Sequence, residues 1–143
     1  MCSTTVLCVD PGVTTGYCLL RGLPEENNYS ILDSGELRWD ANAHNLKELI
    51  GKQPYYFDIM VIENFILYTQ TAREVANNDK YLVTVRTIGA LQALVPHEMI
   101  VFQTASRMAG CPDKELRKLG LWHKSRHVRS AAKHGVVYLR SQL

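Results

Sequence analysis

The chain has 143 residues, enough for one domain, and 46% of them are hydrophobic, enough for a buried core. No apolar run reaches the length that spans a bilayer, and the N-terminus lacks the charged and apolar regions of a signal peptide. We therefore expect a soluble cytoplasmic protein with no membrane partner.

The formal net charge of +2 conceals an asymmetry along the chain. Residues 107–143 carry nine Lys and Arg against two acidic residues, a net of +7, whereas residues 1–106 have a net of −5. A basic C-terminal part favours a polyanionic partner such as nucleic acid, although a solvated helix surface has the same composition.

The four cysteines form no CxxC pair. Cys8 and Cys18 lie within predicted strands and resemble small buried hydrophobic residues. We expect reduced thiols, with neither a zinc site nor a disulfide framework.

The hydrophobic pattern alternates between the periods of strands and helices. Strands are predicted at about 4–10, 16–21, 29–37, 58–63 and 99–102. Helices are predicted at about 43–51, 79–94, 114–119 and 125–140. The segment 22–28 reads as a loop, and Asp113 as the N-cap of the third helix.

The order of these elements indicates an α/β fold. The first two strands are joined by a short turn and must be antiparallel, whereas helices separate the later strands and allow them to be parallel. We predict a mixed sheet flanked by helices.

Two buried strands each end in a carboxylate. Asp10 follows one apolar run and precedes a Pro-Gly turn, and Glu63 ends another. If these strands are neighbours, both carboxylates reach one edge of the sheet. A buried unpaired carboxylate costs several kcal/mol, so a divalent metal ion is the expected partner. The alternative is a salt bridge to a basic residue of the last helix.

The last predicted helix carries polar residues on a face that adjoins its apolar stripe. His127, Ser130 and His134 follow one another at i, i+3 and i+7. His127 is suited to binding a metal or moving a proton near neutral pH, or it is an ordinary surface histidine.

Together these motifs resemble the RuvC-like Holliday-junction resolvases of the RNase H-like superfamily, most closely the compact phage type. The resemblance covers almost the full length and lies in an ordered set of segments. These are Val9–Gly12 with Thr15-Gly16, Val61–Phe65, Arg86–Leu91, Gln103–Ser106 and His127–His134.

The resemblance implies an RNase H-like mixed five-stranded sheet in a single nuclease domain over residues 1–143. It implies an endonuclease that hydrolyses branched DNA, such as four-way junctions, with two Mg²⁺ or Mn²⁺ ions. It further implies a homodimer, no nucleotide cofactor and, for a phage protein, a place in the host cytoplasm.

The resemblance also implies roles for individual residues. Asp10 and Glu63 correspond to metal ligands, His127 to a histidine near the metal, and Phe65 to an aromatic residue that contacts a base. Ser130 stands where the family usually has an aspartate, so the activity is expected to be reduced or lost, through natural drift or an introduced substitution.

The basic face of the last helix is the expected DNA contact, with Lys124, Arg126, Arg129 and Lys133 as its members. Three alternatives remain open. The chain is a catalytically silent module that binds branched DNA, an actin-like nucleotide binder, or a nuclease that processes RNA.

Overall fold

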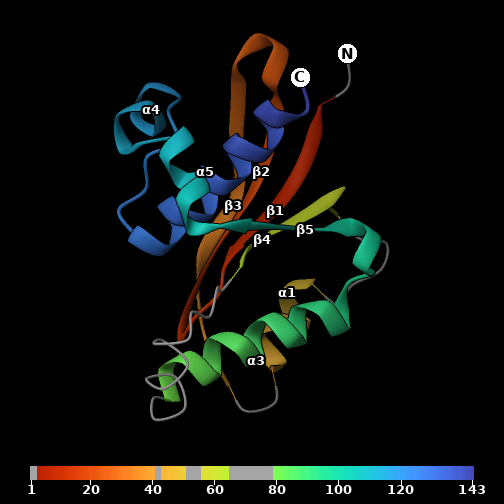
Figure 1. Cartoon of the computed structure of the whole chain (residues 1–143). Helices are drawn as coiled ribbons and strands as arrows, with labels where there is room; N and C mark the ends of the chain where they lie inside the picture. Colours follow the sequence, from red (N-terminus) through yellow and green to blue (C-terminus); the bar gives the residue numbers. More distant parts are fainter. Residues whose placement is uncertain (1–2, 41–42, 51–55, 65–78) are drawn as a thin grey trace.

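The computed structural model describes residues 3–40, 43–50, 56–64 and 79–143. A five-stranded sheet in the order β3-β2-β1-β4-β5 forms its centre (Figure 1). Its strands are β1 (Thr4–Asp10), β2 (Thr14–Leu23), β3 (Asn28–Arg38), β4 (Ile59–Asn64) and β5 (Ile100–Thr104). β1, β2 and β3 pair antiparallel, whereas β4 pairs parallel with both β1 and β5. The predicted mixed sheet is therefore confirmed.

Helices cover both faces of the sheet (Figure 1). The α-helices are α1 (His44–Ile50), α3 (Asp79–Leu94), α4 (Asp113–Lys118) and α5 (Arg126–Ser141). Short 3₁₀ turns span Pro24–Glu26, His97–Met99 and Ala105–Gly110. No helix in the part of the chain that the structure describes is both long and apolar enough to cross a bilayer.

Two local predictions were wrong. The expected loop over 22–28 shrinks to one 3₁₀ turn, because Asn27 adopts a left-handed conformation (φ 49°) and both flanking strands extend toward it. Asp113 is not the N-cap of α4. Pro112 occupies that position, and Asp113 instead pairs with Lys133, with 2.6 Å between Oδ1 and Nζ.

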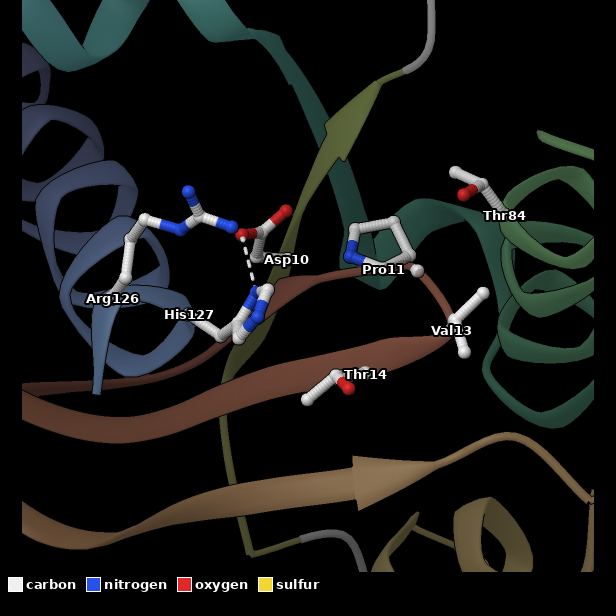
Figure 2. Close-up of a pocket in the computed structure, with 8 residues that line it drawn as sticks. Asp10, Pro11, Val13, Thr14, Thr84, Arg126 and His127 are labelled. Atoms are coloured by element: carbon white, nitrogen blue, oxygen red, sulfur yellow. Dashed lines mark ion pairs between the residues drawn. The ribbon is translucent and has the colours of Figure 1, made fainter. Parts of the chain in front are cut away.

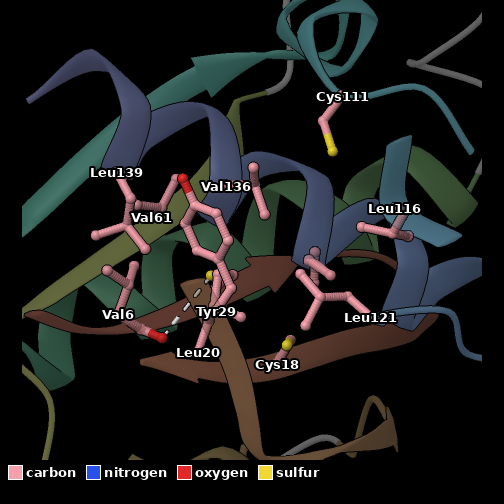
Figure 3. Packing of buried hydrophobic residues seen from close by; sticks show 13 residues of the cluster. Val6, Cys18, Leu20, Tyr29, Val61, Cys111, Leu116, Leu121, Val136 and Leu139 are labelled. Atoms are coloured by element: carbon pink, nitrogen blue, oxygen red, sulfur yellow. Dashed lines mark hydrogen bonds between the residues drawn. The ribbon is translucent and has the colours of Figure 1, made fainter. Parts of the chain in front are cut away.

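Alternation along β1 divides the core into two layers. Val6 and Cys8 pack beneath α4 and α5, in the cluster drawn in Figure 3. Leu7 and Val9 pack on the opposite face, among residues of α1 and α3. Because both faces of β1 are covered, the strand is apolar and buried from Val6 to Val9, directly before Asp10.

Helix α5 lies unusually close to the sheet, and two glycines permit this approach. A Cβ at Gly135 would lie 2.4 Å from Sγ of Cys8, and a Cβ at Gly16 would lie 2.3 Å from the carbonyl of His127. Any larger residue at either position would push the helix away. The first turns of α5 are thereby held directly over the ends of β1 and β2.

Candidate active site

The register of the parallel strands brings the two predicted carboxylates together. Val9 of β1 lies beside Ile62 of β4, and both side chains belong to the layer under α1 and α3. The next residues, Asp10 and Glu63, therefore lie side by side on the opposite face, beneath α5. The sequence prediction that both acids reach one edge of the sheet agrees with this geometry.

The same register extends into a row of residues across all five strands. Gly16 of β2 pairs with Asp10 on one side and with Glu36 of β3 on the other. Gln103 of β5 pairs with Glu63. The row thus carries three carboxyl groups and one amide, with the glycine leaving room for the helix.

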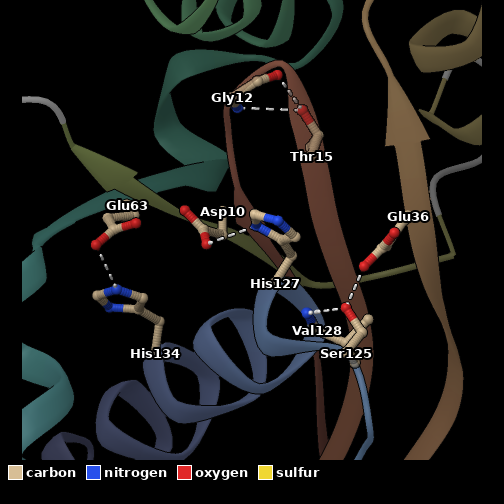
Figure 4. A network of polar contacts seen from close by, with 9 residues as sticks. All are labelled: Asp10, Gly12, Thr15, Glu36, Glu63, Ser125, His127, Val128 and His134. Atoms are coloured by element: carbon tan, nitrogen blue, oxygen red, sulfur yellow. Dashed lines mark hydrogen bonds and ion pairs between the residues drawn. The ribbon is translucent and has the colours of Figure 1, made fainter.

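Helix α5 supplies a polar partner to each end of this row and to its middle. Figure 4 shows its partners for the three carboxyl groups, Glu36, Asp10 and Glu63. At its N-cap, the Ser125 hydroxyl donates to Glu36 and accepts from the backbone N–H of Val128. Two residues further, Nδ1 of His127 lies 4.0 Å from Oδ2 of Asp10. The helix therefore crosses the row from β3 toward β5.

The crossing ends at a histidine buried between two strands. Nδ1 of His134 lies 2.8 Å from Oε1 of Gln103, and Nε2 lies 3.6 Å from Oε1 of Glu63. Residues of the last helix thus approach both carboxylates, as the salt-bridge alternative expected, but each contact is an ion pair only when its histidine is protonated. The partners are histidines rather than lysine or arginine.

The proximity of the two acids shifts their pKa values apart. Burial, hydrogen bonding to Glu63 and its negative charge raise the pKa of Asp10 to about 8, although the Ser130 hydroxyl and the charge of Arg126 act in the opposite direction. Burial raises the pKa of Glu63 as well, but its interactions with His134 and Asp10 bring it below its usual value. Because two carboxylates this close cannot both ionise without strong repulsion, the pair favours sharing one proton near neutral pH.

The donor set fits a hard divalent cation. Nowhere in the described part of the chain do three or more His, Cys, Asp or Glu side chains converge in a ready-made metal site. Mg²⁺ retains several waters and is commonly held by one or two carboxylates, so Asp10 and Glu63 meet that need. An ion there would replace the shared proton as the charge that keeps the two carboxylates together.

A cavity of about 540 Å³ opens beside Asp10 (Figure 2). Its walls are the turn between β1 and β2, Thr84 of α3, and the first residues of α5. The turn is braced by Thr15, whose hydroxyl donates to the carbonyl of Gly12 at 3.1 Å. Arg126 lies on the α5 wall, so a phosphate entering the cavity would meet both its positive charge and the carboxylate pair.

The basic residues predicted to contact DNA have different environments. Lys124 and Arg126 are exposed. Arg129 instead donates to the carbonyls of His123 and Lys124, both at 2.9 Å. Lys133 is only 18% exposed and pairs with Asp113. Arg129 and Lys133 thus brace the chain around α4, and Phe65 lies outside the described residues.

Two polar residues of the site were missed by the sequence interpretation. Gln103 lay one residue beyond the predicted end of its strand, and His134 was noted on the correct helix face but given no role. The available signal was periodicity, because Gln103 alternates with Val101 and His134 follows His127 by seven residues.

No protein-family model and no curated protein matches the chain. Among solved structures, it is similar to T. thermophilus RuvC in complex with a Holliday junction substrate, with a TM-score of 0.64 and 14% identity. That match covers 97% of this chain and 94% of RuvC. Fowlpox virus Holliday junction resolvase, alone and in complex with junction DNA, matches with a TM-score of 0.55 and 12% identity, over 97% of this chain and 99% of the resolvase. The chain therefore shares the RNase H-like fold of the RuvC-type resolvases.

Proposed function

We propose that the protein is a divalent-metal-dependent endonuclease that cleaves branched DNA such as four-way junctions. One observation carries the proposal: Asp10 and Glu63 stand side by side at the ends of parallel strands, on a fold shared with resolvases that are known bound to Holliday junctions. The cavity beside Asp10 and the exposed Arg126 on its wall support a phosphate-containing substrate.

Each residue of the site has a distinct proposed role. Asp10 and Glu63 would hold Mg²⁺ or Mn²⁺, with His127 beside them. When bound, the metal activates water for in-line attack on the phosphate and stabilises the leaving 3′ oxygen. Asp10 would release its proton to solvent in order to serve as a ligand, and Arg126 would attract and orient the phosphate.

The assay that tests this function compares a synthetic four-way junction with a duplex of the same sequence, each with Mg²⁺, Mn²⁺ or EDTA. We expect metal-dependent nicking of the junction and little of the duplex. Asp10→Asn should abolish nicking, because it removes a proposed metal ligand. It should retain junction binding, because the amide adds no negative charge that would repel phosphate. Nicking that persists in EDTA or in Asp10→Asn would contradict the proposal. An RNA duplex added as competitor tests the alternative of a nuclease that processes RNA, because such an enzyme would bind the RNA and cut the junction more slowly.

Ser130 is expected to limit the activity of this chain. It is half-buried on α5, and its neutral hydroxyl interacts with Asp10 without adding a charge. We expect Ser130→Asp to supply a third carboxylate and raise the nicking rate roughly a hundred-fold, equivalent to a few kcal/mol of transition-state stabilisation. Ser141→Asp, at the exposed end of the same helix, is the matched control. An unchanged rate in Ser130→Asp would show that Ser130 is not a defect.

The second candidate is a module that binds branched DNA without cutting it. Two observations favour it: Ser130 offers no carboxylate, and no three ligating side chains converge among residues 3–40, 43–50, 56–64 and 79–143. Selective junction binding without nicking in Mg²⁺ or Mn²⁺, together with nicking gained in Ser130→Asp, would support this candidate.

A four-way junction has two-fold symmetry, so resolution needs two cuts and we infer a homodimer. Helix α3 offers a surface for the second copy, because Leu82 and Val85 are 37% and 48% exposed. Further along the same helix, Ile88 and Leu91 pack in the core layer on one face of the sheet. Analytical ultracentrifugation of the free protein and of its junction complex measures the stoichiometry.

A further inference from the structure

His134 occupies an unusual position for a histidine. It is 0% exposed, at the centre of a helix whose neighbouring buried residues are Ala131, Ala132, Gly135 and Val136. Its Nδ1 is engaged by Gln103, but its buried Nε2 has no hydrogen-bond partner within bonding distance. That nitrogen faces Oε1 of Glu63 at 3.6 Å (Figure 4).

A buried nitrogen without a hydrogen-bond partner costs free energy. An apolar residue at this position would avoid that cost. The cost is removed if the neutral ring carries its proton on Nε2 and donates it to Glu63. Nδ1 then accepts from the side-chain N–H of Gln103, once a turn of that amide exchanges its oxygen and nitrogen. A displacement of the carboxylate by about 0.8 Å would bring the pair to ordinary hydrogen-bond distance. The direction in which the ring already points favours that contact.

We propose that His134, held in place by Gln103, is a positioning residue that orients the Glu63 carboxylate for metal binding. The proposal rests on the proposed function, since it concerns the same site. Gln103 fixes the ring from behind, and the ring then fixes one oxygen of Glu63, leaving the other directed toward Asp10. Residues that orient a metal ligand in this way contribute to metal affinity although they do not touch the ion.

The strand register explains why this arrangement is rigid. Gln103 and Glu63 are paired residues on neighbouring parallel strands, so their side chains emerge on the same face. His134 descends from α5 between them, and Gly135 allows the helix to lie close enough for contact. Each carboxylate of the pair thus has its own histidine on α5, with His127 beside Asp10 and His134 beside Glu63.

This pairing also compensates for what Ser130 lacks. An aspartate at that position would contribute its own charge, whereas the serine leaves Asp10 and Glu63 as the two adjacent carboxylates among the described residues of the site. With few ligands, the affinity depends more strongly on how well each is oriented before the ion arrives. His134 supplies that orientation one helical turn beyond Ser130.

The contact itself is tested in the metal-free protein, by NMR of the imidazole ring nitrogens. We expect Nε2 of His134 to carry a proton and its resonance to move in Glu63→Gln. Glu36→Gln is the matched control, because Glu36 lies in the same row but is bonded by Ser125. An unprotonated Nε2, or a resonance that ignores Glu63→Gln, overturns the proposal whether or not the protein cuts DNA.

The consequence is tested by calorimetric titration with Mn²⁺. His134→Leu should lower the affinity at least about ten-fold, whereas His134→Gln, which keeps an N–H donor, should restore most of it. Leu139→Ala controls for destabilisation, because it removes core volume from the same helix away from the site. All variants are compared well below their unfolding temperatures.

The two proposals fail in different ways. If the unsubstituted protein binds Mn²⁺ and His134→Leu binds it equally well, the role of His134 is wrong and the proposed nuclease stands. If the unsubstituted protein neither binds Mn²⁺ nor nicks the junction, the proposed function is wrong, and the positioning of a metal ligand fails with it.

Discussion

Asp10 is the residue of the site whose ionisation is most affected by burial and by neighbouring charges. It is largely buried, borders a second carboxylate and has Arg126 as its source of positive charge. Ionising two adjacent, partly buried carboxylates costs free energy, because each loses hydration and repels the other. The metal-free protein therefore favours one shared proton on the pair. In the metal-free protein the proposed metal ligand Asp10 thus favours the protonated form, which does not bind a cation.

This protonation gives a pH-dependent stability with a definite sign. Asp10 ionises near pH 4 in the unfolded chain and at about 8 in the folded one. Between these values the folded state binds more protons, so the free energy of unfolding falls as the pH rises and the contribution is lost above about 8. The lowered pKa of Glu63 acts in the opposite direction, but only in the acid range.

Replacing Asp10 by Asn should therefore remove this loss. We expect Asp10→Asn to unfold at a higher temperature than the unsubstituted protein at pH 8.5, by several degrees, since one pKa unit corresponds to about 1.4 kcal/mol. Thermal unfolding in EDTA from pH 5 to 9 measures how the unfolding temperature of each protein depends on pH. Glu25→Gln, an exposed position, should keep the original pH dependence. Identical slopes for all three proteins would refute the shared proton.

At this scale the sequence predicted the two acids but not their partners. Asp10 and Glu63 stood out because an apolar run that ends in a charge is a local pattern. Gln103 and His134 become partners only through the register of β5 and the angle at which α5 crosses the sheet. Neither quantity is encoded in neighbouring residues, so composition and periodicity could not reveal them.

At the scale of elements, α5 and the sheet form the unit that builds the site. Gly16 is the point of closest approach, since it pairs with Asp10 and lies directly beneath His127. The sequence interpretation predicted this glycine as the first residue of a strand and gave it no contact with the last helix. In the structure its role is spatial, because the missing side chain is what lets the first turn of α5 rest on β2.

Gly16→Ala should accordingly disturb both the fold and the site. The new Cβ would meet backbone atoms of His127, which move only if the whole helix end moves. We expect a loss of about 1–3 kcal/mol in the free energy of unfolding, together with weaker Mn²⁺ binding. Urea denaturation and calorimetry measure the two effects.

Gly89→Ala is the matched control for that substitution. It lies within α3, where an added Cβ meets nothing within 4 Å. It should raise the free energy of unfolding by up to about 1 kcal/mol, because alanine favours the helix. If both alanine variants behaved alike, the close contact at Gly16 would carry no energetic weight.

The boundaries of most elements were predictable because strong local signals mark them. Pro96 follows α3, and Ser125 caps α5 by accepting from the backbone N–H of Val128. The hairpin between β2 and β3 was predicted too short, since polar residues at 22–28 suggested a loop while cross-strand pairing extended both strands. Tertiary pairing overrode composition there.

At the scale of the whole molecule, ion pairs between helices neutralise part of the positive charge of the C-terminal part. The two acidic residues of the C-terminal part, Asp113 and Glu115, pair with Lys133 and Arg140 at 2.6 and 2.7 Å. The net charge of +7 on residues 107–143 therefore lies on the other seven basic residues. Those of them that are exposed are Arg107, Lys114, Arg117, Lys118, Lys124 and Arg126. Polyanion binding is thus expected around α4 and the start of α5, rather than along the whole of α5.

The salt dependence of junction binding tests where that surface lies. Each phosphate contact contributes about −0.9 to the slope of log affinity against log salt. Lys124→Gln combined with Arg126→Gln should make the slope shallower by up to about 1.8 and weaken binding at low salt. Lys133→Gln should leave the slope unchanged, because its charge is already neutralised by an ion pair. Arg21→Gln with Lys47→Gln, which removes two exposed charges elsewhere, is the matched control. A slope that responds to Lys133→Gln or to the control pair, but not to Lys124 and Arg126, would place the DNA on another face of the molecule.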